Sequence, residues 1–362
     1  MKLTRRGYAV VAVVAGCLVM AWLYGARSLN ALVAPLLLAL LAAVVAVSRA
    51  EAPTVERAAV EDGFVGERRT VSLSLTAGNP IAATVEDEVG DGLATIREAP
   101  SESWREGIVA DPEADAVADL TIAEGSEVTY DVRLTARGER TVGPVTVTVR
   151  DVLGLVSREF SVAATGRVLV YPEVYDLRGA SRRDLRTLAL AIREGSREEF
   201  DHLREYDRGD SLRDVHWKST AKRADGELVV KEFVADDDVG EVALLAEAGR
   251  DRADQMATAT ASVATYLLES GVRVSVATPA GSLPSRAGHD HHLEALRLLA
   301  RTGDGIATDR ARREADVVVR ADETGTVVAV GEETIPFDRF REGDLRTGIA
   351  PDSKDEGREV VA

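Results

Sequence analysis

The residues best suited to chemistry or recognition lie in a block at 203–233 that carries dense charges of both signs. Gly209 gives a turn, and Asp210 is a good N-cap because its carboxylate can accept from the free amides that begin a helix. That helix is predicted over 211–223, and a strand is predicted over 227–233 after a second turn. These two elements must position the side chains of the block.

Two side-chain pairs on the predicted helix are spaced for contact. Arg213 and Trp217 are four residues apart, close enough for a guanidinium to lie over an indole, and Asp214 and Lys218 favour an ion pair. One interpretation is an ion-pair network that clamps the segment onto the next domain, because charges at such density usually pair with one another. The other is a docking face for a second protein, with Trp217 and Arg213 as anchors of the types enriched at interface hot spots.

Phosphate or metal binding are further interpretations of charged clusters in this chain. Four basic side chains could bind a phosphate or nucleotide, although no glycine-rich cradle accompanies them: Lys218, Lys222, Arg223 and Lys231. Four side chains of the same block could ligate a metal: His202, Asp207, Asp210 and His216. A second metal candidate is the cluster His289, His291 and His292, but adjacent residues at a helix start point in different directions. A helix N-cap at Asp290 is the simpler interpretation there.

Complete catalytic motifs are missing from the sequence. Four hydroxyls at helical spacing could suggest a serine nucleophile, but no Gly-x-Ser-x-Gly elbow accompanies them, so we interpret them as a polar helix face: Thr258, Thr260, Ser262 and Thr265. No Walker A loop and no Gly-x-Gly-x-x-Gly motif occurs, which argues against ATP hydrolysis by the chain itself. We therefore predict no catalytic residues, no cofactor and no bound metal, and favour a binding protein over an enzyme.

Composition restricts the class of protein. A length of 362 residues indicates two or three folding units at about 100–200 residues each. The 44 basic and 61 acidic residues give a net charge of −17, which argues against nucleic acid as a partner. The one cysteine, Cys17, lies in an apolar run, so neither an intrachain disulfide nor a thiolate metal cluster can form.

The first fifty residues predict a membrane anchor. Residues 7–26 and 28–48 carry no charge, and each reaches the ~20 residues that a bilayer core requires. Only Arg27 separates them, so we expect a transmembrane helical hairpin within residues 1–50, in contact with the lipid bilayer.

Basic residues around the two spans predict their orientation. Lys2, Arg5 and Arg6 precede the first span and Arg49 follows the second, whereas Arg27 stands alone at the tip. The positive-inside rule then places both ends, and the soluble domains, on the cytoplasmic side of the cell membrane. The rival interpretation is a secretory signal peptide, which is disfavoured because a second full-length span follows and no small-x-small cleavage site is evident.

The charge distribution also indicates the solvent. All 61 acidic residues follow position 50, so the soluble part of the chain is strongly anionic. Self-repulsion on this scale is best tolerated in molar salt, where the Debye length falls to about 3 Å. We therefore predict a halophilic, archaeal protein; an ordinary acidic protein from a GC-rich gene is the alternative.

Residues 51–175 have the pattern of an all-β domain. β-Branched residues alternate with polar ones in short runs bounded by turn residues, which predicts half-buried strands. The predicted strands are 70–76, 128–134, 145–149 and 160–162. We expect a small antiparallel sandwich of immunoglobulin-like architecture. The acidic stretch 98–119 lacks a pattern and is predicted to be a loop.

After a charged segment at 176–240 the hydrophobic period changes. Strands are predicted at 242–245, 272–277, 315–319 and 326–330, and helices at 251–270 and 291–300. This alternation is typical of an open sheet of parallel strands covered by helices, so residues 241–345 are predicted to form an α/β, Rossmann-like domain. The polar residues 346–362 are predicted to be a disordered tail.

The charged block resembles the signature of a known family, the domain of unknown function 58. The matching string is Arg204-Glu-Tyr206, Gly209-Asp210, Arg213 and Val215-His-Trp217-Lys-Ser-Thr-Ala221. Upstream segments at 136–138, 143–144, 151–155 and 170–172 are similar to the region that precedes it in the same family. The family motif, and with it the candidate partner-binding set, comprises Arg204, Tyr206, Gly209, Asp210, Arg213, Trp217, Lys218, Ala221 and Lys222.

The resemblance implies a membrane-anchored protein with a degenerate von Willebrand A-like domain, and a MoxR-type AAA+ ATPase as its partner. Two departures matter. Metal-binding von Willebrand A domains end their first strand with Asp-x-Ser-x-Ser, whereas this chain has Ala246-Glu-Ala-Gly-Arg250, so no adhesion-type metal is predicted. Lys222 stands where the family more often has arginine.

The sequence thus predicts a membrane-anchored cytoplasmic adaptor that acts with a MoxR-type AAA+ ATPase. The alternative is an enzyme or small-ligand-binding domain whose site lies at the carboxyl ends of the α/β strands, the usual crevice in such sheets.

Overall fold

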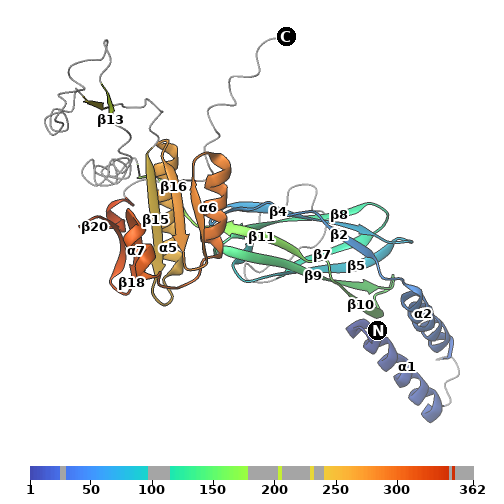
Figure 1. Ribbon diagram of the computed structural model, residues 1–362. Helices are drawn as coiled ribbons and strands as arrows, with labels where there is room; N and C mark the ends of the chain where they lie inside the picture. Colours follow the sequence, from blue (N-terminus) through green and yellow to red (C-terminus); the bar gives the residue numbers. More distant parts are fainter. Residues whose placement is uncertain are drawn as a thin grey trace, which may run out of the picture. The chain divides into compact units, whose positions relative to one another are not determined.

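The chain folds into two compact units, Met1–Tyr171 and Pro172–Ala362. The computed structural model describes residues 1–24, 30–96, 115–177, 203–205, 229–231, 240–341 and 345–346. Figure 1 shows a helix pair and β-strands in the first unit, and strands with helices beside them in the second.

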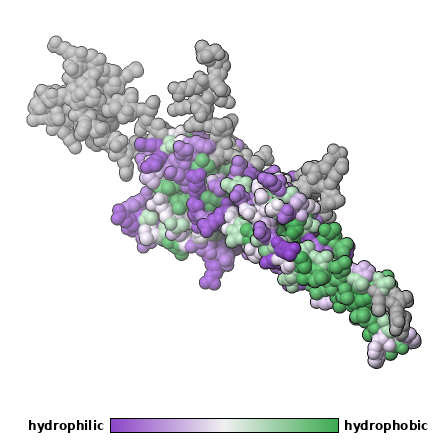
Figure 2. All heavy atoms as spheres, turned by 90° about the vertical axis from the view of Figure 1, so that its right-hand side faces the viewer, coloured by the Kyte–Doolittle hydropathy of each residue, from purple (hydrophilic) through white to green (hydrophobic). Residues whose placement is uncertain are grey.

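Two apolar helices begin the first unit. Helices α1 (Arg5–Tyr24) and α2 (Asn30–Arg49) have 20 residues each, about 30 Å at 1.5 Å per residue, which matches the hydrocarbon core of a bilayer. Large apolar side chains on them face outward, such as Trp22, which is 84% exposed, and Leu38, which is 67% exposed. Figure 2 shows the continuous hydrophobic surface that the helices carry. The predicted pair of apolar helices is confirmed, and both are candidate membrane spans by length and composition.

The rest of the first unit is built of strands in two sheets. The strands are β1 (Lys2–Leu3), β2 (Thr54–Arg57), β3 (Gly63–Phe64), β4 (Arg68–Thr76), β5 (Ile81–Val89), β6 (Leu93–Thr95), β7 (Ala116–Ile122), β8 (Ser126–Leu134), β9 (Gly138–Arg150), β10 (Val156–Val162) and β11 (Gly166–Tyr171). One sheet has the antiparallel order β2-β4-β8-β6. The other is centred on the long strand β9, which pairs with β5 on one edge and with β10 and β11 on the other.

Alternating apolar residues join the two sheets into a sandwich. In β4, Leu73 and Leu75 are fully buried and pack against Val85 and Val147 of the opposite sheet. The β-rich domain and its predicted strands are confirmed as parts of β4, β8, β9 and β10.

The predicted loop at 98–119 is wrong at its end. Ala116 to Asp119 belong to β7, which pairs antiparallel with β5. Residues 98–114 of that prediction lie outside the described residues. Strand β5 was not predicted either, because three acidic residues in its second half hide the alternation.

One of those acidic residues, Asp87, is buried at the contact between the sheets. Its carboxylate accepts from Nη1 and Nη2 of Arg57 at 2.8 and 2.6 Å and from the hydroxyl of Tyr130 at 2.5 Å. Arg57 also donates to the carbonyl of Ala164 at 2.8 Å. Burial, and then the charge of Asp87, raises the pKa of Tyr130, which keeps its hydroxyl protonated as a donor. The cluster is a paired buried charge that connects one sheet to the other.

The second unit contains a six-stranded mixed sheet. Its elements are β15 (Glu241–Ala248), α5 (Ala253–Glu269), β16 (Arg273–Thr278), β17 (Gly281–Arg286), α6 (His289–Arg301), α7 (Asp309–Glu314), β18 (Val317–Asp322), β19 (Gly325–Val330), β20 (Glu333–Pro336) and the 3-10 helix η3 (Phe337–Arg339). The strand order is β17-β16-β15-β18-β19-β20. A separate ribbon pairs β12 (Val174–Tyr175) with β21 (Leu345–Arg346).

The predicted strands and helices between 242 and 330 are confirmed, but an all-parallel sheet is wrong. Strands β16 and β18 run parallel to β15 because helices lie in the connections. Strands β17, β19 and β20 each follow the preceding strand through a short turn, and such turns make the pairing antiparallel. Helix α5 packs Ala259, Val263 and Leu267 against one face of the sheet and supplies much of the core.

Candidate functional site at the carboxyl ends of the parallel strands

Strands β15 and β18 end side by side, with Ala248 opposite Ala321. Ligands of open α/β sheets usually bind beyond such carboxyl ends, so the side chains here are the first to consider. Ala246 and Ala248 pack on Met256 of α5. Because side chains alternate along a strand, Glu247 points to the opposite face of the sheet.

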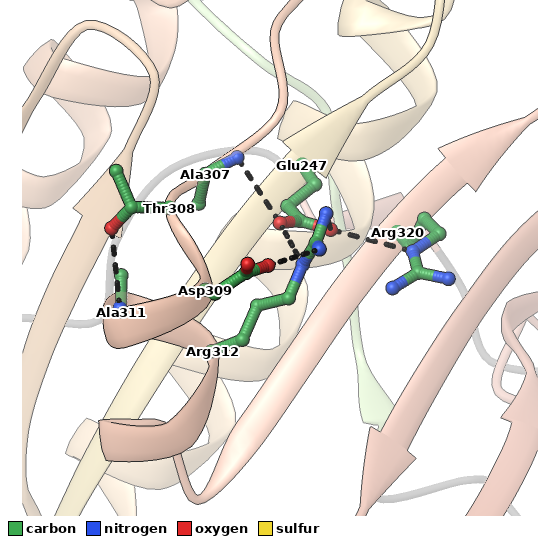
Figure 3. Close-up of polar contacts among 7 residues, drawn as sticks. All are labelled: Glu247, Ala307, Thr308, Asp309, Ala311, Arg312 and Arg320. Atoms are coloured by element: carbon green, nitrogen blue, oxygen red, sulfur yellow. Dashed lines mark hydrogen bonds and ion pairs between the residues drawn. The ribbon is translucent and has the colours of Figure 1, made fainter.

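Glu247 is 2% exposed and both of its oxygens are engaged (Figure 3). Oε1 accepts from the amide of Ala307 at 3.1 Å and from Nε of Arg312 at 2.7 Å. Oε2 accepts from Nη2 of Arg312 at 3.3 Å and from Nε of Arg320 at 3.4 Å. The carboxylate therefore fastens the end of β15 to α7 and to β18.

Helix α7 is placed to bring Arg312 to Glu247. The side chain of Thr308 caps the helix by accepting from the amide of Ala311 at 3.3 Å, and Asp309 in the first turn pairs with Arg312 at 3.3 Å. The hydrogen bond and the charge of Glu247 raise the pKa of Arg312, so its guanidinium stays charged. With two cations and an amide around it, Glu247 suits a structural ion pair better than a general base or a metal ligand.

A cleft of about 350 Å³ lies on the α5 side of the same strand ends. It is lined by the first turns of α5, the β18–β19 turn, η3 and the segment around β12: Glu173, Tyr175, Arg252, Asp254, Gln255, Thr258, Asp322, Gly325, Thr326, Phe337, Asp338 and Arg341. Glu247 is not among these residues. The lining carries four acidic and two basic side chains, so the cleft has the position of an α/β ligand site with a mixed, mainly acidic lining.

Tyr175 connects several residues in one wall of the cleft. The guanidinium of Arg341 lies 5.0 Å from the ring centre of Tyr175 and donates to its hydroxyl at 3.2 Å. The ring of Tyr175 meets Phe337 edge-on at 6.2 Å, and its amide donates to Ser262 at 3.0 Å. Asp322, another lining residue, accepts from the hydroxyl and the amide of Thr324, and these hydrogen bonds lower the pKa of Asp322.

The start of α5 is held by a residue from a distant loop. Asp304 accepts from the amides of Asp251, Arg252 and Ala253 at 2.6, 3.2 and 2.9 Å. These amides are donors that a helix start leaves free, and a carboxylate there also complements the helix dipole. Asp304 therefore supplies the carboxylate that satisfies the free amides at the start of α5.

Three of the four hydroxyls predicted as a polar helix face are buried instead, whereas Thr258 lines the cleft. Thr260, Ser262 and Thr265 of α5 are all under 5% exposed. Thr260 and Ser262 donate to carbonyls one turn back, at 2.7 Å each, which satisfies the hydroxyls without solvent. They are therefore packing groups between α5 and its neighbours.

The histidine cluster is divided between two neighbours. His291 Nε2 lies 2.7 Å from the carbonyl of Val274, and His292 Nε2 lies 2.8 Å from the hydroxyl of Thr265. The predicted N-cap at Asp290 is wrong, because the chain turns into α6 at Gly288 with a positive φ of 96°. Among the described residues, no group of three or more His, Cys, Asp or Glu side chains is placed to hold a metal ion.

The family-motif block is bounded by a two-stranded ladder. Strand β13 (Leu203–Glu205) pairs antiparallel with β14 (Val229–Lys231), with Arg204 opposite Val230. The strand predicted at 227–233 is confirmed at 229–231. The other motif residues lie outside the described residues: Tyr206, Gly209, Asp210, Arg213, Trp217, Lys218, Ala221 and Lys222. The same holds for the other metal and phosphate candidates of the block, His202, Asp207, His216 and Arg223.

Residues 202–331 match the model of the family described as "Protein of unknown function DUF58". This region of the chain belongs to the DUF58 family. The DUF58 region contains the β13–β14 ladder, the Glu247 cluster and most of the mixed sheet. No curated protein matches the chain.

Solved structures similar to parts of the chain share little sequence with it. A segment of alpha-2-macroglobulin from Escherichia coli is 18% identical with a TM-score of 0.26, covering 34% of this chain and 24% of that one. A non-cellulosomal cohesin from Archaeoglobus fulgidus is 12% identical with a TM-score of 0.25, covering 33% and 91%. The CARDB domain of a Pyrococcus furiosus protein is 15% identical with a TM-score of 0.21, covering 34% and 90%.

Several residues that shape the DUF58 region were not predicted from the sequence. Arg312 and Arg320 are far from Glu247 along the chain, and no local pattern connects them to it. The one available signal was the single acidic residue in the otherwise apolar end of a buried strand, since a buried carboxylate requires a partner.

Proposed function

We propose that the protein is a membrane-anchored adaptor that presents its 203–233 segment to a MoxR-type AAA+ ATPase on the cytoplasmic side. In this proposal α1 and α2 cross the cell membrane as a hairpin. The β-sandwich, of immunoglobulin-like type, is the body next to the membrane. The α/β unit is a degenerate von Willebrand A-like domain that carries the docking segment, in an acidic, salt-adapted archaeal protein.

The observation that carries the proposal is the pairing of β13 with β14. Leu203 lies opposite Lys231 and Glu205 opposite Val229, so the ladder closes the two ends of the motif segment against each other. The residues between them include Arg213 and Trp217, the side-chain types most enriched at interface hot spots. A segment whose two flanking strands pair and whose sequence carries such residue types is a suitable recognition element for a second protein.

The Glu247 cluster supports a binding role for this unit over catalysis at that residue. The carboxylate accepts four hydrogen bonds, three of them from arginines. A general base must have a free lone pair for the incoming proton, and a ligand of a divalent cation must face the ion. The hydrogen bonds of Glu247 instead hold α7 against the sheet.

A capture experiment tests the adaptor proposal. The tagged full-length protein is extracted from native membranes in detergent at high salt, and co-purifying proteins are identified by mass spectrometry. The wild type should retain a MoxR-type AAA+ ATPase, and the double variant Trp217→Ala, Arg213→Glu should lose at least tenfold of it. A matched control is Arg313→Glu, which reverses an exposed charge on α7. Equal capture by both variants, or no AAA+ ATPase with the wild type, would contradict the proposal.

A small-ligand site is the second candidate, and the cleft beside α5 favours it. Its position beyond β15 and β18 is the usual one for α/β ligands. A screen of small anions, nucleotides and amino acids by thermal shift would test this role. A ligand whose stabilisation disappears in Arg341→Gln, but not in Arg313→Gln, would establish it.

A further inference from the structure

The turn between β9 and β10 carries two apolar side chains in the open. Val152 is 98% exposed and Leu153 is 54% exposed. The turn is nevertheless well fixed, because the carboxylate of Asp151 accepts from the amides of Leu153 and Val156 at 2.9 and 2.7 Å. Gly154 completes it with a positive φ of 66°, which suits glycine. Two exposed apolar residues on an ordered turn require a reason.

The same turn is fastened to the start of α1. The amide of Thr4 donates to the carbonyl of Leu155 at 3.0 Å, and its hydroxyl donates to the carbonyl of Gly154 at 2.5 Å. Gly7 permits the close approach, since a Cβ there would lie 2.2 Å from the carbonyl oxygen of Leu155. The turn therefore lies beside the first two turns of the helix.

The end of α2 is tied to the neighbouring strand. Nη1 of Arg158 in β10 donates to the carbonyls of Ser48 and Ala50 at 3.3 and 3.2 Å. Leu155 and Val156 pack with Ala43 and Val47 of α2, and Leu40 joins the same cluster. Leu40 is nine residues from the end of α2, about 14 Å along the helix at 1.5 Å per residue. The β9–β10 hairpin therefore packs against apolar residues within α2 and not only against the end of that helix.

Other turns at this end of the sandwich are different in composition. The β4–β5 turn contains Gly78, Asn79 and Pro80, and the β7–β8 turn contains Glu124 and Gly125. Basic residues instead accompany the apolar turn. The first residues of α1 are Arg5 and Arg6, and Nη1 of Arg6 lies 3.7 Å from the position of a Cβ on Gly154. Apolar tips next to arginines are typical of segments that enter the headgroup region of an anionic bilayer.

We propose that the 151–155 turn is a lipid-contacting tip. Val152 and Leu153 lie at the boundary between headgroups and acyl chains of the leaflet that faces the soluble domains, and the nearby arginines face anionic headgroups. The inference rests on the membrane anchoring in the proposed function. It adds a third membrane contact that fixes the sandwich against the bilayer surface.

Site-directed spin labelling of the full-length protein in vesicles tests this tip. In a Cys17→Ser background, single cysteines at Val152, Leu38 and Asp91 are labelled and reconstituted in vesicles of three parts zwitterionic to one part anionic lipid. Leu38 faces outward in α2, and Asp91 is exposed after the far end of β5, where Val89 pairs with Val142. Accessibility to oxygen, relative to a water-soluble nickel complex, reports depth in the bilayer. All three sites are exposed, so the substitutions should not disturb folding.

The three labels separate the outcomes. We expect the oxygen-to-nickel accessibility ratio at Val152 to be at least threefold higher than at Asp91 and lower than at Leu38. A Val152 ratio equal to that of Asp91, with Leu38 still protected from nickel, would overturn the tip while leaving the anchor in place. A nickel-accessible Leu38 would instead overturn the membrane anchoring, and the tip with it.

Discussion

Replacing Glu247 with glutamine tests the role assigned to this buried carboxylate. The substitution keeps the size of the side chain and removes its charge. Arg312 and Arg320 then lose their shared anion. The NH2 group of glutamine can only donate, so the N–H groups that faced one of the carboxylate oxygens are left without an acceptor. We expect α7 and the end of β15 to loosen while the rest of the sheet stays folded.

The magnitude follows from the burial of the three side chains. Removing one partner of a fully buried ion pair costs about 3–5 kcal/mol. Here Glu247 is 2% exposed, but the side chains of Arg312 and Arg320 are 33% and 48% exposed and can turn partly to water. The cost should therefore be smaller, about 2–3 kcal/mol of local stability. At about 1.4 kcal/mol per factor of ten, this is roughly 30- to 140-fold faster amide exchange.

Hydrogen exchange with mass spectrometry measures this in the intact protein. Peptides covering α7 and β15 should show the acceleration, and peptides from the β-sandwich should not change. Asp309→Asn is the matched control, because Asp309 pairs with the same Arg312 at 3.3 Å but its side chain is 86% exposed. That variant should change exchange by less than about fivefold. Equal effects of the two variants would refute the argument that burial gives the Glu247 pair its strength.

Four other perturbations have expected results. Asp87→Asn should destabilise the sandwich by about 3–5 kcal/mol, because it leaves the guanidinium of Arg57 buried without its anion. Tyr130→Phe should destabilise it by about 1.5–3 kcal/mol. Amide exchange rates of β5 and β8 peptides measure both effects, and a change below tenfold for Asp87→Asn would contradict the buried-pair assignment. Because the pKa of Asp322 is lowered in the folded protein, its ionised form stabilises the β18–β19 turn at pH values above the ordinary pKa of 3.8. This stabilisation is lost as the pH falls through the lower pKa of the folded state. Asp322→Asn should therefore flatten the acid dependence of amide exchange in that turn, and an unchanged pH profile would contradict this role of Asp322. The net charge of −17 predicts a thermal midpoint that rises between 0.1 and 3 M KCl, and a flat or falling midpoint would contradict the salt-adapted surface.

Much of the fold could be predicted because its apolar residues follow simple periods. The uncharged runs before Arg27 and after it became α1 and α2, and the β-branched alternation at 70–76 became β4. Strand β5 was missed because Asp87 occupies a core position. Its compensation by Arg57 and Tyr130 comes from other strands and cannot be seen locally.

The direction of the strands in the α/β unit was harder to predict. Strand β17, with the sequence GSLPSR, has few apolar residues, so neither its presence nor its antiparallel pairing was evident. Helix α7 has no buried residue, and the amphipathic pattern on which prediction depends is therefore absent. For the candidate site, the sequence indicated only a position at the carboxyl ends of the α/β strands. Glu247 and its arginine partners were not predicted, because tertiary structure brings those arginines to it.

The side of the membrane on which the soluble units lie tests the adaptor proposal most directly, because an ATP-driven partner acts in the cytoplasm. A single cysteine at Ala280, in the exposed turn between β16 and β17, is placed in the Cys17→Ser background, and sealed right-side-out vesicles are treated with a membrane-impermeant maleimide. The proposal predicts that Ala280→Cys stays unlabelled until the vesicles are opened with detergent. Labelling of the intact vesicles would place the soluble domains outside the cell and contradict it.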